Sequence, residues 1–162
     1  MDKRWLVEQL ADRLRQSAAV ARRESEAAAT EAREGATASE RKEDARVLLE
    51  YGSLAKGQNR RAERALSDLA TIESFHPAPV RPSGPVAMGA VVEVEDGEEG
   101  RTFFLAPAGA GMELTGPGGD GFLSVVTAAS PIGRAVLGRR VGDSFEVVVE
   151  GNAREWTITW VG

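Results

Sequence analysis

Residues 125–143 read VVTAASPIGRAVLGRRVGD, and they carry the signals for a strand, a short helix and a return into a second strand. The valines at the start belong to a β-branched run, which is typical of a strand. Ser130 is a favourable N-cap, and Pro131 suits the first helical position because its missing N–H is not needed there. Gly138 ends the predicted helix, and Val-Gly-Asp then turns the chain. The stretch therefore predicts a strand–helix–strand unit within a small sheet domain.

Further short strands are expected on both sides of this unit. β-branched and aromatic residues recur in runs of four to seven, separated by turn pairs such as Asp96-Gly97 and Gly151-Asn152. One helix among six strands predicts an α+β domain over residues 86–162, with a curved sheet around the helix. The predicted strands are 91–95, 101–106, 112–115, 122–126, 145–150 and 155–161, and the predicted helix is 131–137.

Residues 1–75 have a different composition, rich in Ala, Arg and Glu and free of proline. Small and apolar residues recur at alternating spacings of four and three, as in the seam of a coiled coil. We expect an antiparallel helical hairpin with its tip near residues 34–44 and arms of roughly 45 Å at 1.5 Å per residue. The expected seam residues are Val7, Ala11, Leu14, Ala18, Ala21, Ser25, Ala28 and Ala32 in the first helix, and Ala45, Leu48, Gly52, Ala55, Asn59, Ala62, Leu66 and Leu69 in the second. Asn59, a polar seam residue, is expected to set the register of the pair.

A proline-rich linker is expected at residues 76–88, where four prolines prevent helix continuation and favour an extended spacer. The linker contains His76, the only histidine of the chain, and no residue of metal-ligand spacing accompanies it. The chain has no cysteine, which excludes disulfides and thiolate metal sites.

The net charge of −5 lies entirely in residues 76–162, because acidic and basic residues balance in 1–75. Tight sequence-independent DNA binding needs many uncompensated Lys and Arg, so this function is excluded, and we expect no sequence-specific DNA binding. No apolar run approaches the ~18–20 residues that span a bilayer, and the first residues lack the apolar segment of a signal peptide. We therefore expect a cytoplasmic protein without a membrane partner.

The expected hairpin tip carries the carboxylates Glu40, Glu43 and Asp44. One interpretation is structural, because Thr37 and Glu40 have the spacing of a capping box and acids favour the positive end of a helix dipole. The other interpretation is functional, because a long, thin hairpin displays these groups at the end of its reach. The residues themselves leave both open.

Residues 125–143 resemble the C-terminal domain of the Gre family of bacterial transcript-cleavage factors. That domain carries a similar Ser-Pro-(Ile/Leu)-X-(Arg/Lys)-Ala-Leu-Leu-Gly helix, a Val-Gly-Asp turn and a valine-rich strand, and it also follows a helical hairpin. The resemblance implies an FKBP-like fold for 86–162 and docking on the rim of the secondary channel of RNA polymerase. By position, the docking candidates are Ser130, Pro131 and Ile132, with helix-start and core roles as the alternative.

In the family, the hairpin tip carries a Gly-Asp-Leu-(Ser/Lys)-Glu-Asn-Ala pattern, and the most similar stretch here is residues 40–45, ERKEDA. The resemblance implies that Glu40 and Glu43, with Asp44, are auxiliary catalytic carboxylates. They would share magnesium with the polymerase, whose own nuclease activity the factor assists. The factor itself would be no enzyme and would have no cofactor of its own. This tip departs from the pattern in having Glu40 for the aspartate and two basic residues beside it.

Arg60, Arg61 and Arg64 form a basic cluster on the second helix. The resemblance implies contact with nascent RNA, and the alternative is a solvated face paired with nearby glutamates (Glu24, Glu26 and Glu63).

These observations support a monomeric regulator of transcription elongation that binds the secondary channel and stimulates RNA cleavage. Two alternatives remain open at this point: a channel binder that is non-cleaving or inhibitory, and an FKBP-like interaction module whose coiled coil oligomerises it.

Overall fold

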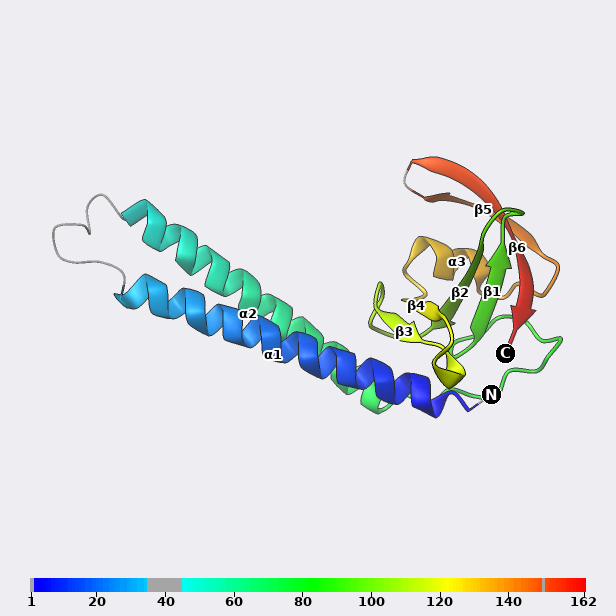
Figure 1. Cartoon of the computed structure of the whole chain (residues 1–162), viewed down its shortest axis with the longest axis horizontal. Coiled ribbons are helices and arrows are strands. Elements are labelled where there is room, and N and C mark those ends of the chain that lie inside the picture. The colour runs from blue at the N-terminus through cyan, green and yellow to red at the C-terminus, as the bar shows by residue number, and fades with distance from the viewer. Residues whose placement is uncertain (1, 35–44, 150) are drawn as a thin grey trace. The chain divides into compact units, whose positions relative to one another are not determined.

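Two long helices precede a six-stranded sheet in the computed structural model, which describes residues 2–34, 45–149 and 151–162 (Figure 1). The long helices are α1 (Arg4–Glu34) and α2 (Ala45–Glu73), and the short helix is α3 (Pro131–Val136). The chain forms two compact units, Asp12–Ala70 and the remainder. The strands are β1 (Val91–Glu95), β2 (Gly100–Leu105), β3 (Glu113–Thr115), β4 (Phe122–Val126), β5 (Ser144–Val149) and β6 (Asn152–Val161).

The unit Asp12–Ala70 contains the two helices of the predicted hairpin, which lie side by side and antiparallel (Figure 1). The seam predicted for the first helix is confirmed within this unit, since Leu14, Ala18, Ala21, Ser25 and Ala28 are all buried. The hydroxyl of Ser25 donates across the pair, 3.0 Å from the carbonyl oxygen of Ala55 and 3.2 Å from Oδ1 of Asn59. These bonds satisfy a buried hydroxyl only in one alignment of the helices. Asn59 itself is exposed, so its expected place on the seam is wrong, and its role in setting the register stays a prediction.

The seam predicted for the second helix is wrong at Leu66, which is 41% exposed. Its neighbour Ala65 is buried instead, as is Ala62. The sequence pattern allowed both phases, because apolar residues occur at 65 and at 66. The seam closes on the smaller side chain because two alanines let the helix axes approach closely, and the longer Leu66 then lies at the flank of the contact.

The predicted strands and the α+β fold class are confirmed. The order across the sheet is β3-β4-β2-β1-β6-β5, with β2 and β4 parallel and all other neighbours antiparallel. The main difference from the prediction is at β6, which begins at Asn152 and pairs with the whole length of β5.

The sheet has two distinct faces, which we call the α3 face and the base face. On the α3 face, Val92, Phe103 and Ile158 pack into one core cluster with Val136 of the short helix. Because side chains alternate along a strand, Val91 and Phe104 point to the base face, where they are also buried.

The first residues of α1 belong to the same compact unit as the sheet and contact it directly. The Gln9 side chain pairs with the backbone of Thr115, accepting from its N–H at 2.6 Å and donating to its carbonyl at 3.3 Å. Leu10 lies against Gly109, where a Cβ would come within 2.8 Å of the leucine. These contacts explain why Met1–Ala11 and Thr71–Gly162 form one compact unit.

Candidate functional site

The carboxylates predicted at the hairpin tip, Glu40, Glu43 and Asp44, lie outside the described residues, and their expected shared magnesium site lies there with them. Within the part of the chain that the structure describes, no group of three or more His, Asp or Glu side chains is arranged to hold a metal ion. No helix of this part is long and apolar enough to cross a membrane. Two candidate sites lie within the described residues. One is the α3 segment, residues 127–137, and the other is a groove between α1 and α2, which we call the hairpin groove.

The α3 segment begins with a side-chain cap at Ser130. Its Oγ accepts a hydrogen bond from the N–H of Gly133 at 3.2 Å and donates to the carbonyl oxygen of Thr127 at 2.8 Å. Pro131 occupies the first turn, and the N–H of Arg134 donates to the carbonyl oxygen of Ser130 at 2.9 Å. The predicted N-cap and the predicted place of Pro131 are thus both confirmed.

Gly133 is essential to this segment, and sequence analysis did not single it out. A Cβ at Gly133 would overlap the carbonyl oxygen of Thr127, so no larger residue fits without moving the chain. The only signal in the sequence was a glycine in the interior of a short helix, where glycine is unfavourable unless close packing requires it. The Ser130 cap and the contact at Gly133 hold the turn before α3 in one conformation.

The docking candidates differ in exposure. Pro131 is exposed, whereas Ile132 is half-buried and packs against the core cluster of the α3 face. Ile132 also lines a small cavity together with Phe145, Trp156 and Arg101. The segment thus presents Pro131 outward, while Ile132 contributes to the core as well as to the surface.

Two arginines after α3 are held by backbone carbonyls. Arg139 donates to Ala135 at 2.6 Å and to Ser144 at 3.0 Å, and its guanidinium lies 6.0 Å from the ring centroid of Phe145. Arg140 donates to the carbonyl oxygen of Ser83 at 2.6 Å. The bond from Arg140 to Ser83 ties part of the proline-rich segment to the sheet domain, although that segment was predicted as a spacer.

The β1–β2 turn is organised by Asp96. Its Oδ1 accepts hydrogen bonds from the backbone N–H groups of Glu99 at 2.8 Å and Glu98 at 3.0 Å, and Arg154 donates to Oδ2 at 3.0 Å. The two N–H groups, with Glu99 first, and then Arg154 hold the pKa of Asp96 below its usual value. This carboxylate stabilises the turn and is not placed in a candidate site.

Lys3 is a buried charged residue that sequence analysis did not identify. Its Nζ donates to the carbonyl oxygens of Ala78 at 3.3 Å and Gly162 at 3.4 Å, and burial lowers its pKa. His76, in contrast, is exposed, and its Nδ1 lies 3.0 Å from the carbonyl oxygen of Ser74.

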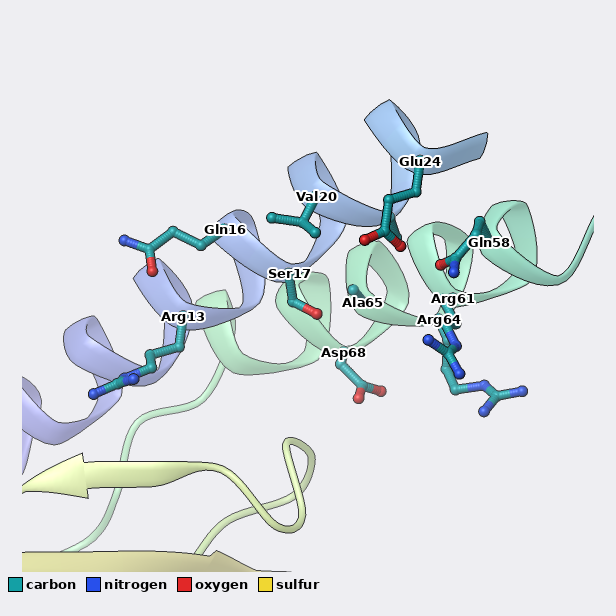
Figure 2. Close-up of a pocket in the computed structure, with 11 residues that line it drawn as sticks. Arg13, Gln16, Ser17, Val20, Glu24, Gln58, Arg61, Arg64, Ala65 and Asp68 are labelled. Atoms are coloured by element: carbon teal, nitrogen blue, oxygen red, sulfur yellow. The ribbon is translucent and has the colours of Figure 1, made fainter. Parts of the chain in front are cut away.

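The hairpin groove lies between α1 and α2 and has a volume of about 530 Å³ (Figure 2). Arg61 and Arg64 line it from α2, and Arg13 lines it from α1. Arg60, the third member of the predicted cluster, is exposed but does not line the groove. Two acidic residues, Glu24 and Asp68, also line it.

The charged side chains that line the groove form no ion pair with one another within the described residues. Within the described ranges, no ion pair joins Arg60, Arg61 or Arg64 to the glutamates considered as their partners, namely Glu24, Glu26 and Glu63. In the same part of the structure, Oε1 of Gln58 is buried in the groove wall without a hydrogen-bond partner. The groove therefore presents guanidinium groups that remain available to a ligand.

Comparisons with known proteins agree with this architecture. The family model described as "Transcription elongation factor, GreA/GreB, C-term" matches residues 81–162. The transcription elongation factor GreA of Paracoccus denitrificans is 33% identical over 154 residues, which are 93% of this chain and 89% of that protein. GreA of Rhodospirillum rubrum is 36% identical over 78 residues, covering 47% of this chain and 45% of that protein.

Among solved structures, the transcription factor Gfh1 aligns over 94% of this chain and 93% of its own, with 26% identity and a TM-score of 0.39. The family assignment rests on the family model and on the Paracoccus relative. The family model covers half of the chain, and the Paracoccus relative extends the match through the hairpin. The chain belongs to the GreA/GreB family of transcription elongation factors.

Proposed function

We propose that this protein docks on RNA polymerase through Ser130, Pro131 and Ile132, and that Glu40, Glu43 and Asp44 at its tip assist cleavage of backtracked RNA. Membership of the GreA/GreB family makes the chain an elongation factor of the polymerase secondary channel, an accessory protein and not an enzyme. Neither the non-cleaving or inhibitory channel binder nor the oligomerising interaction module is favoured by this membership. A cytoplasmic location is part of this proposal, and RNA polymerase as partner supports it.

The observation that carries the docking proposal is the rigid turn before α3. Two side-chain hydrogen bonds at Ser130 and the close approach at Gly133 hold this turn, and Pro131 is exposed on it. A surface that is already ordered loses little conformational entropy when it binds. This makes the segment a suitable anchor, while the hairpin extends by roughly 45 Å at 1.5 Å per residue.

The chemistry proposed for the tip needs few protein ligands. Magnesium prefers oxygen ligands and keeps several waters, so one or two carboxylates added to a site of the polymerase are sufficient. A second metal ion close to the first stabilises the attacking and leaving oxygens of phosphoryl transfer. Residues three apart on a helix share a face, so Glu40 and Glu43 would approach one ion if the second helix begins at the tip.

We assign the nascent RNA to the hairpin groove. Arg61 and Arg64 line it, Arg60 lies beside them, and none of the three forms an ion pair within the described residues. Phosphates of an RNA segment held by the polymerase would supply the missing partners. This role needs neither sequence-specific DNA binding nor a second copy of the chain, so we propose a monomer.

Cleavage of RNA in stalled, backtracked elongation complexes tests the proposed role of the tip. The Glu40→Ala/Glu43→Ala double variant is expected to lower the cleavage rate at least tenfold, which corresponds to about 1.4 kcal/mol of transition-state stabilisation. Glu31→Ala, which removes an exposed carboxylate from α1, is the matched control and should retain cleavage.

Polymerase binding measured on the same proteins separates the possible failures. Wild-type cleavage by the double variant contradicts the role of the two carboxylates. Binding without any cleavage by the wild-type protein contradicts the catalytic proposal but retains docking. Absence of binding contradicts the whole proposal.

A further inference from the structure

The base face of the sheet is left partly uncovered, at a small cavity of about 160 Å³. Its floor is formed by Val91 and Leu123, which are buried. Across the floor runs a row of three residues in direct register, because Glu93 pairs with Thr102 of β2 and with Trp160 of β6. Directly opposite residues in neighbouring antiparallel strands have Cβ atoms about 4.5–5.5 Å apart. The row therefore places a carboxylate beside an indole.

The opposite wall is the turn between β3 and β4, which contains the 3₁₀ turn η2 (Pro117–Gly119). The turn is closed by a hydrogen bond from the N–H of Gly116 to the carbonyl oxygen of Gly121 at 2.9 Å. A Cβ at Gly116 would overlap the carbonyl oxygen of Asp120, so the turn is packed tightly against itself. Phe122, directly after the turn, lines the cavity and is 74% exposed.

The charge of this cavity is one-sided. Glu93 and Asp120 line it, and no basic side chain of the described residues does. Neither carboxylate takes part in an ion pair within the described ranges. The surrounding segment, residues 76–162, carries the whole net charge of −5. An exposed phenylalanine and a 37% exposed tryptophan line the same cavity as these two acids. Aromatic rings and carboxylates both attract cations.

We propose that this cavity binds the guanidinium group of an arginine that belongs to a protein partner. A planar guanidinium stacks on an aromatic face and at the same time donates to carboxylates, which matches Trp160, Phe122, Glu93 and Asp120. The volume of the cavity agrees with the size of a single arginine side chain. The volume is several times the ~30 Å³ share of a water molecule and below the ~300–1,000 Å³ of small-molecule sites. This surface is on the sheet face opposite α3, so the inference goes beyond the proposed function and does not depend on it.

Titration of the full chain with a blocked Gly-Arg-Gly peptide, followed by the amide and indole N–H signals in NMR, tests this site. The matched ligand carries citrulline in place of arginine, which keeps the shape but removes the charge. Saturable shifts are expected at the Trp160 indole and at Gly116 and Gly121. The Trp156 indole should not move, because Trp156 is buried on the α3 face.

The Glu93→Gln/Asp120→Asn variant should bind the arginine peptide about tenfold more weakly, the effect of losing roughly one charge-assisted hydrogen bond. Phe122→Ala, at an exposed position that tolerates truncation, should also weaken binding. Glu98→Gln is the control, because Glu98 is exposed and does not line the cavity. Equal shifts with the citrulline peptide, or unchanged affinity in both the double variant and Phe122→Ala, would overturn the proposal.

Discussion

At the scale of single residues, the α3 segment depends on a glycine that has no room for a side chain. Gly133 approaches the carbonyl oxygen of Thr127 so closely that a methyl group would overlap it. The same approach lets the N–H of Gly133 reach the hydroxyl of Ser130. One missing methyl group therefore determines the conformation of the turn that carries Pro131.

Gly133→Ala is expected to lower the free energy of unfolding of the sheet domain by about 1–3 kcal/mol, the typical cost of overpacking a tight site. Chemical denaturation followed by the fluorescence of the buried Trp156 measures this loss. Gly100→Ala introduces the same methyl group into β2, where it meets only ordinary contacts at 3.7 Å and beyond, and serves as the control. A stable Gly133→Ala variant would show that the turn can shift without loss.

Asp96 gives the β1–β2 turn a dependence on pH. Its pKa is lowered in the folded protein, so the unfolded chain binds the proton more readily. The stabilisation is therefore fully present above the unfolded pKa of about 3.9 and is lost as the pH falls through the folded value. Asp96→Ala should be less stable than the wild-type protein near pH 7, and the difference should shrink below about pH 4.

Melting temperatures of the two proteins across this pH range measure the effect. Glu98→Ala, which removes a neighbouring acid that forms no ion pair within the described residues, is the control. If the difference in melting temperature between the wild-type protein and Asp96→Ala stays constant with pH, the ionisation of Asp96 is not its cause.

At the scale of elements, the hairpin is built from small side chains. Alanines form most of the buried seam of the unit Asp12–Ala70, so each residue contributes little apolar area. α2 also contains two glycines, Gly52 and Gly57, neither of which is required by a close approach. These two glycines therefore lower the stability of α2 without providing a close contact in return.

Gly57→Ala is expected to stabilise α2 by about 0.5–1 kcal/mol, because alanine has the higher helix propensity and its methyl group meets no other atom. Hydrogen exchange of the α2 amides around position 57 should become slower by the corresponding factor. Exchange in β2, within the other compact unit, provides the internal reference. Faster exchange in α2 would contradict this prediction.

At the scale of the whole molecule, the chain divides its proposed tasks between separate compact units. Docking is assigned to the α3 segment, RNA contact to the hairpin groove, and assistance of cleavage to the tip. Substitutions far apart with no shared partners act independently. The Glu40→Ala/Glu43→Ala variant is therefore expected to keep the wild-type affinity for RNA polymerase while its cleavage falls, as measured on the same elongation complexes.

How much of this was predictable depends on the range of the signals. The strands, the N-cap at Ser130 and the seam of α1 between Leu14 and Ala28 follow local rules of alternation, capping and periodicity, and each is confirmed. The phase of α2 was not predictable, because apolar residues at 65 and 66 allowed two seams. The roles of Glu40, Glu43 and the arginine cluster remain predictions.

By itself, the sequence determined the order of helical hairpin and sheet domain, and the family through residues 125–143. These properties are local, since neighbouring residues decide where an element begins, ends and turns. Only the tertiary structure decided which side chains meet from distant positions: Gly133 with Thr127, and the row of Thr102, Glu93 and Trp160. Strand register and close packing create these contacts, and both depend on the whole fold rather than on sequence neighbours.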